Sequence, residues 1–302
     1  MHPLRVLGIY FAVVLIGGAL IAPCLYWFAP VATGMFPSLA DVPFHRFLLR
    51  SILLMGLAGM WPLTRALGVG SLKALGWPPP TAHWNWLASG FLMGIVSLAI
   101  VAGIALLAGG RMFREGLTGV RLLEKLMGAV ATAAAVSVIE ETLFRGAIFG
   151  GMRRALRWRL ALVGSSVLYA AAHFLGKAEF HGPITWHTGL ESLLQMTRTF
   201  ADGGALLPGF LSLTLAGVLL GLAYQRTGNL YFSLGLHGGW TFCQKLYSAL
   251  TTSAPGNNVA LLGSGRMIDG WLAFVVLVLA LGVVSRFMPC VVLREGMRAG
   301  SQ

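Results

Sequence analysis

Eight long apolar segments occupy most of the chain and constrain its fold more than any other feature. Each is close to the ~20 residues that an α-helix needs to cross the hydrocarbon core of a bilayer. Helices satisfy all their backbone polar groups internally, which the bilayer core requires. The segments run approximately over residues 5–28, 47–66, 84–108, 126–152, 158–175, 205–224, 229–250 and 270–289. We therefore predict an all-α, polytopic membrane helix bundle of about eight transmembrane helices with a polar intramembrane cavity.

The composition supports this fold class. Only 11% of the 302 residues are charged and 57% are hydrophobic, and the mean hydropathy is +0.77. A soluble domain carries about 25% charged residues. No connection between the apolar segments is long enough for a separate soluble domain. We therefore expect residues 1–302 to form a single integral membrane domain.

The three cysteines do not indicate a disulfide framework or a zinc site. Cys24, Cys243 and Cys290 all lie in or beside apolar segments, and no Cys-x-x-Cys pair occurs. Free cysteine behaves as a small buried hydrophobe in most proteins. We interpret all three as small core residues.

The formal net charge of +12 indicates contact with anionic lipid headgroups rather than nucleic acid. Nucleic-acid binding requires a soluble basic face, and this chain has no soluble domain to carry one. Basic residues also gather in cytoplasmic loops. The tight cluster Arg153–Arg159 therefore predicts that both termini are cytoplasmic. The chain has no N-glycosylation sequon, and this fits a multi-pass protein of a prokaryotic plasma membrane.

One connection has an apolar periodicity of its own. Trp186, Leu190, Leu193 and Leu194 recur at helical spacing, which suits an amphipathic helix on the membrane surface. An ordinary folded loop is the alternative interpretation.

Two adjacent acids interrupt the fourth apolar segment. Glu140 and Glu141 are followed four residues later by Arg145. A charged side chain at the bilayer centre costs about 2.5–3.5 kcal/mol on insertion scales, so function is the default hypothesis. Glu141 and Arg145 share a helix face and can pair, whereas Glu140 points about 100° away. The alternative is a structural ion pair with one additional glutamate.

Two further apolar segments carry polar residues at the same spacing of four. Tyr169 and His173 share one face of the fifth segment, and His237 and Thr241 share one face of the seventh. A single histidine near a helix end is more often interfacial than catalytic. The pair Gly238–Gly239 allows close approach of another helix or of a substrate backbone.

Together, Glu140 and the two histidines form a set that can activate water and stabilise an oxyanion. The same three residues, Glu140, His173 and His237, are also the candidate ligands if a divalent metal such as zinc is bound. No His-Glu-x-x-His motif occurs, which excludes the common zinc-protease arrangement. We expect no metal or other cofactor.

The polar residues of these three segments form an ordered set of motifs. The set resembles that of the CAAX prenyl protease type II family, which includes CAAX proteases and bacteriocin-processing proteins (CPBP). The resemblance covers about residues 126–245, which we take as the catalytic core. Thr241 stands where asparagine is common, and Tyr169 where phenylalanine is common. The motifs are Glu140-Glu141-x-x-x-Arg145, Tyr169-x-x-x-His173 and His237-x-x-x-Thr241.

The resemblance implies an intramembrane endopeptidase of the glutamate type. Glu140 would deprotonate the attacking water and return the proton to the leaving amine, and His173 would help to hold that water. His237 and Thr241 would donate hydrogen bonds to the oxyanion. Glu141 and Arg145 would support Glu140. The implied substrate is a peptide or a lipidated protein.

Two other classes of protein remain open. A non-enzymatic membrane protein of the same family would serve bacteriocin immunity or scaffolding, with the polar cluster used for packing. Solvent access distinguishes the two, because an enzyme needs water to reach Glu140 whereas a scaffold buries the cluster. A transporter ranks last, because matched half-repeats are absent from the sequence.

Overall fold

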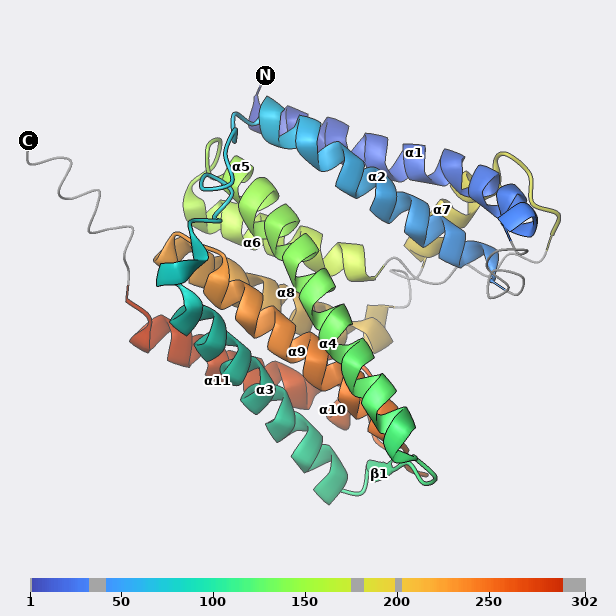
Figure 1. Cartoon of the computed structure of the whole chain (residues 1–302), viewed down its shortest axis with the longest axis vertical. Coiled ribbons are helices and arrows are strands. Elements are labelled where there is room, and N and C mark those ends of the chain that lie inside the picture. The colour runs from blue at the N-terminus through green and yellow to red at the C-terminus, as the bar shows by residue number, and fades with distance from the viewer. Residues whose placement is uncertain (1, 33–41, 175–181, 199–202, 290–302) are drawn as a thin grey trace, which may run out of the picture. The chain divides into compact units, whose positions relative to one another are not determined.

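The structure is a computed structural model that describes residues 2–32, 42–174, 182–198 and 203–289 (Figure 1). The eight predicted segments each contain a helix, which confirms the all-α class. The long helices are α1 (Pro3–Ala32), α2 (Phe44–Ala66), α3 (Trp84–Leu107), α4 (Gly119–Glu141), α6 (Trp158–His173), α8 (Gly203–Thr227), α9 (Tyr231–Leu250) and α11 (Trp271–Phe287).

Short elements connect these helices. Strand β1 pairs antiparallel with β2, and Met112 lies opposite Thr252. The π-helix η3 continues α4 without a break in the chain. The short elements are η2 (Pro80–Ala82), β1 (Arg111–Phe113), η3 (Thr142–Phe149), α5 (Gly150–Met152), α7 (Thr188–Arg198), β2 (Thr251–Ser253) and α10 (Val259–Leu262).

Among the residues that the structure describes, five stretches of helix are long and apolar enough to cross a bilayer, so the chain is a polytopic helical membrane protein. They are Pro3–Pro30, Phe44–Ala66, Trp84–Leu107, Gly119–Met152 and Leu207–Thr227. The other three predicted spans form α6, α9 and α11, of 16, 20 and 17 residues. Helices α6 and α11 are too short to be among the five stretches. Polar residues such as His237 and Lys245 lower the mean hydropathy of α9. That these three helices also cross the membrane stays a prediction.

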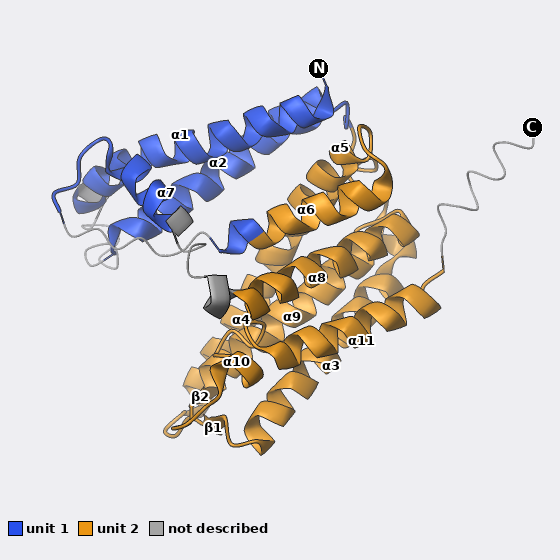
Figure 2. Ribbon diagram, turned by 180° about the vertical axis from the view of Figure 1, so that it is seen from behind, with its two compact units in different colours: residues 1–70, 171–203 blue, residues 71–170, 204–302 orange. Residues whose placement is uncertain are grey.

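The described residues group into two compact units (Figure 2). Unit 1 comprises residues 1–70 and 171–203, and unit 2 comprises residues 71–170 and 204–302. The single membrane domain predicted for residues 1–302 stays a prediction.

In unit 1, α2 and α7 both pack against α1. A Cβ atom on Gly18 of α1 would lie 2.8 Å from the Cα atom of Ile52 in α2, so these two helices approach closely. The predicted amphipathic helix forms as α7. Its residues Leu190 and Leu193 pack on the buried cluster around Leu48, whereas Leu194 is exposed. The apolar face of α7 is thus used for packing within the unit.

In unit 2, glycines bring α3 and α9 into backbone contact. Gly90 and Gly94 on α3, and Gly235 and Gly239 on α9, form two small-xxx-small patterns. A Cβ atom on Gly239 would lie 3.1 Å from the Cα atom of Gly94. This confirms helix packing as the role of Gly239. This close contact fixes the position of α9 against α3, and therefore also the position of His237, which lies on α9.

Candidate active site

The two glutamates are the last residues of α4, and the π-helix η3 begins directly after them. At the junction, the Thr142 hydroxyl donates to the carbonyl oxygen of Val138 at 2.6 Å. π-Helical turns are rare and frequently mark functional sites. Helical propensities do not indicate this transition, so the sequence predicted a continuous helix here.

Glu141 and Arg145 form the ion pair that their spacing predicts. Glu141 Oε1 lies 3.2 Å from Arg145 Nη1, and the side chains are 0% and 3% exposed. The guanidinium group also lies over the ring of Tyr169, 4.4 Å from its centroid. Tyr169 comes from α6 and is itself buried. A cation over an aromatic face gains electrostatic stabilisation when it is desolvated.

His237 brings α9 into contact with both glutamates. Its Nδ1 atom forms a 2.8 Å hydrogen bond with Glu141 Oε1. Its Nε2 atom lies 3.8 Å from Glu140 Oε2, which is too long for a direct hydrogen bond. Glu141 therefore has two partners, Arg145 on its own helix and His237 on another. Sequence periodicity predicted only the first, because His237 is 96 residues away.

Solvent access separates the two glutamates. The side chain of Glu140 is 25% exposed, whereas that of Glu141 is fully buried. The 100° that separates adjacent residues on a helix accounts for this difference. The side chain of Glu140 is thus partly exposed, although its Oε2 atom, which faces the buried imidazole of His237, is itself buried.

The remaining predicted residues differ in their surroundings. Thr241 lies one turn after His237 on α9 and is partly exposed. His173 is the last residue of α6, is exposed, and is assigned to unit 1, whereas the other predicted site residues belong to unit 2. The predicted role of His173 therefore stays a prediction.

The arrangement offers only part of a metal site. A catalytic zinc is commonly held by three protein ligands. Among the residues that the structure describes, no group of three or more His, Cys, Asp or Glu side chains could hold a metal ion. Within unit 2, Glu140 and His237 are the two predicted ligands that lie together.

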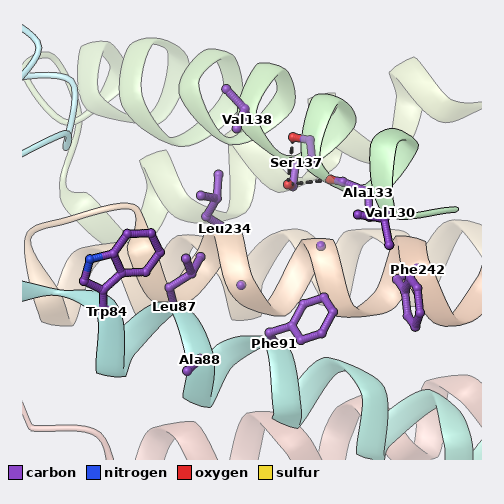
Figure 3. Close-up of a pocket in the computed structure, with 13 residues that line it drawn as sticks. Trp84, Leu87, Ala88, Phe91, Val130, Ala133, Ser137, Val138, Leu234 and Phe242 are labelled. Carbon is purple, nitrogen blue, oxygen red and sulfur yellow. Dashed lines mark hydrogen bonds between the residues drawn. The ribbon is translucent and has the colours of Figure 1, made fainter. Parts of the chain in front are cut away.

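Residues of α3, α4 and α9 line a cavity of about 380 Å³ (Figure 3). Apart from the Trp84 indole and the Ser137 hydroxyl, its lining side chains are apolar. Ser137 donates to Ala133 O of its own helix at 2.6 Å. This cavity is therefore apolar. The polar intramembrane cavity that the sequence predicted stays a prediction.

The cavity adjoins the polar cluster along both helices. Ser137 lies one turn before Glu141 on α4, and Gly238 follows His237 on α9. The site therefore combines a partly exposed glutamate side chain, a buried histidine and an apolar cavity.

Comparison with known proteins identifies the same part of the chain. Residues 122–243 match the family model described as type II CAAX prenyl endopeptidase Rce1-like. The match contains Glu140, Glu141, Arg145 and both predicted histidines, and it confirms the resemblance given by their motifs. No curated protein and no solved structure matches the chain. Residues 122–243 therefore constitute a domain of the Rce1-like type II CAAX prenyl endopeptidase family.

Proposed function

We propose that this protein is an intramembrane endopeptidase in which Glu140 activates the attacking water. The family match supplies the class of enzyme. The observation that carries the proposal is the chain of contacts from Arg145 through Glu141 to His237, which ends 3.8 Å from Glu140. Three of these four residues are buried, and the side chain of the fourth, Glu140, is partly exposed.

The contacts assign a direction to the hydrogen bond between Glu141 and His237. In the ion pair with Arg145, Glu141 is a carboxylate, and a carboxylate only accepts hydrogen bonds. His237 Nδ1 therefore carries a proton and donates to Glu141. The ring is held with Nε2 directed towards Glu140, and a bridging water is the usual arrangement across such a separation. Glu141 acts mainly by orienting His237.

The proposed role of His237 is that of an oxyanion donor. In this role both ring nitrogens carry a proton: Nδ1 donates to Glu141, and Nε2 donates to the oxyanion of the tetrahedral intermediate. Thr241, one turn further along α9, supplies the second donor.

The reaction then proceeds by general acid–base catalysis. Glu140 takes a proton from water as the oxygen attacks the scissile carbonyl carbon. The carbon–nitrogen bond breaks when Glu140 returns this proton to the leaving amine. The predicted role of His173, to hold the attacking water, is part of this proposal.

The substrate is a peptide or a lipidated protein in the membrane. The apolar cavity beside Ser137 and Gly238 accommodates an apolar part of the substrate near the scissile bond. The basic cluster Arg153–Arg159 supports a plasma-membrane orientation with both termini in the cytoplasm.

Replacing Glu140 with Gln tests the proposal. The purified protein is reconstituted in liposomes and assayed with a panel of lipidated and unmodified peptides. We expect E140Q to lower kcat at least ~10²-fold, since a general base contributes 10²–10⁴-fold. The matched control is E124Q, because Glu124 is an exposed glutamate on the same helix. Cleavage by E140Q at the rate of E124Q would contradict the proposal.

The complete burial of Glu141 favours one alternative, a scaffold or immunity protein that uses the cluster for packing. Under this alternative, wild type and E140Q both lack peptidase activity and have the same thermal stability. The wild-type assay with the peptide panel therefore distinguishes the two functions.

A further inference from the structure

We propose that the segment Leu75–His83 fixes the position of α4 relative to α9, the two helices that carry the catalytic residues. We propose that Trp77 is the main positioning residue of this segment. The inference rests on the proposed function, because it concerns the geometry that brings Glu140 and Glu141 to His237. The segment connects α2 to α3 and includes the short helix η2. Its contacts reach both η3 and α9, and all of them lie within unit 2.

The first set of contacts supports η3. The indole Nε1 of Trp77 donates to the Thr142 hydroxyl at 3.1 Å. Thr142 is the residue directly after Glu141, and its hydroxyl in turn donates to Val138 O. One turn later, a Cβ atom on Gly146 would lie 2.7 Å from Leu75 O, so the two backbones are in close contact. The segment thus contacts η3 at its first residue and near its middle.

The second set of contacts reaches the start of α9. Leu230 N donates to Gly76 O at 2.9 Å, and the Tyr231 hydroxyl donates to Pro78 O at 2.8 Å. The Tyr231 ring packs edge-on against the Trp77 ring, with 5.8 Å between the ring centroids. The His83 ring stacks on the Tyr231 ring, with 5.3 Å between the centroids. His237 lies six residues, fewer than two helical turns, after Tyr231.

The backbone of the segment is suited to this role. Gly76 has a φ of +92°, and a Cβ atom there would lie 2.7 Å from the Tyr224 ring. Three consecutive prolines, Pro78 to Pro80, restrict φ and limit the conformations of the following turn. A rigid connector therefore links the helix that carries the glutamates to the helix that carries His237.

The rigidity of the segment Leu75–His83 matters for catalysis, because it keeps Glu140 close to His237. π-Helical turns are rare, so η3 needs support from neighbouring elements. Catalytic groups must be held within about 0.5 Å of their productive geometry. Loss of the hydrogen bond from Trp77 to Thr142 lets the end of α4 shift, which separates Glu140 from His237. The chemical step slows while the apolar cavity that receives the substrate is unchanged.

The test is a double-mutant cycle on the hydrogen bond. W77F removes the N–H donor and keeps an aromatic ring, and T142V removes the hydroxyl and keeps the shape. We expect each to lower kcat about three- to tenfold with little change in KM, since one hydrogen bond is worth about 0.5–1.5 kcal/mol. The double variant should be no slower than the slower single variant, and T142S should restore activity.

The matched control is W271F, because Trp271 lies at the start of α11, outside the site. A kcat for W77F equal to that of W271F would overturn the proposal, as would additive effects of W77F and T142V. If T142V does not fold, W77F and T142S still provide the comparison.

Hydrogen exchange of residues 142–149 supplies a readout that does not depend on peptidase activity. Faster exchange in W77F than in W271F supports the proposed restraint, and equal exchange contradicts it. If E140Q is inactive while W77F matches the wild type in both measurements, only the positioning role fails. If the wild type cleaves no peptide, the proposed function fails, and hydrogen exchange still tests the restraint.

Discussion

Helix α9 meets α3 and α4 through two different kinds of contact. Towards α3, glycines bring the backbones together, and a Cβ atom on Gly239 would lie 3.1 Å from Gly94 Cα. Towards α4, a Cβ atom on Gly238 would lie 3.5 Å from Ser137 Oγ, an ordinary van der Waals separation. The second contact contains the apolar cavity and the polar cluster. The close contact with α3 thus fixes the position of α9, whereas the looser contact with α4 leaves the apolar cavity.

The largest effect should come from breaking the polar part of the contact between α4 and α9. We expect E141Q to lower kcat about 10²-fold or more, because the carboxylate that accepts the hydrogen bond from His237 Nδ1 and orients the ring is lost. Loss of the orienting carboxylate in a comparable Glu/Asp–His pair costs up to about 10⁴-fold. Steady-state kinetics against pH would measure this change.

E124Q again serves as the control for a charge change on α4. A change in thermal stability with an unchanged kcat and pH profile would show that Glu141 only pairs with Arg145. In that case the orienting role proposed for Glu141 would be wrong.

The next effect should come from disturbing the tight contact between α3 and α9. We expect G239A to destabilise the protein by about 1–3 kcal/mol, the usual cost of overpacking. G238A should change stability by less than about 0.5 kcal/mol, because its Cβ atom meets no atom closer than 3.5 Å. Thermal unfolding of the two purified variants in the same detergent would compare them directly. Equal destabilisation by both substitutions would contradict the difference between the two contacts.

A smaller effect should follow from narrowing the cavity. Ala134 lines it, whereas its exposed neighbour Ala135 does not. We expect A134L to raise KM about tenfold for the best cleaved peptide while kcat changes little, since steric misfit in an apolar pocket costs about 1–3 kcal/mol. A135L adds the same side chain outside the cavity and should leave KM unchanged. Identical kinetics of the two variants would show that this cavity does not receive the substrate.

Local periodicity explains what could be predicted about the site. The spacing of four residues was sufficient to pair Glu141 with Arg145, because neighbours on one helix face are set by helix geometry. The hydrogen bond of Glu141 with His237 could not be predicted in this way. It depends on how α9 packs against α4, and that packing follows from glycines on α3 and α9.

The amino-acid sequence by itself determined the fold class, the positions of the long helices and the set of polar residues placed within them. Segment length, low charge and helical spacing are local properties that can be read from the sequence. Apolar segments of this length span a bilayer as helices, because a helix satisfies its own backbone hydrogen bonds. Only the tertiary structure decided that Glu141 is buried between Arg145 and His237, that the side chain of Glu140 is partly exposed, and that the adjacent cavity is apolar. These features arise where separate helices meet, so they depend on side-chain contacts between residues far apart in the chain.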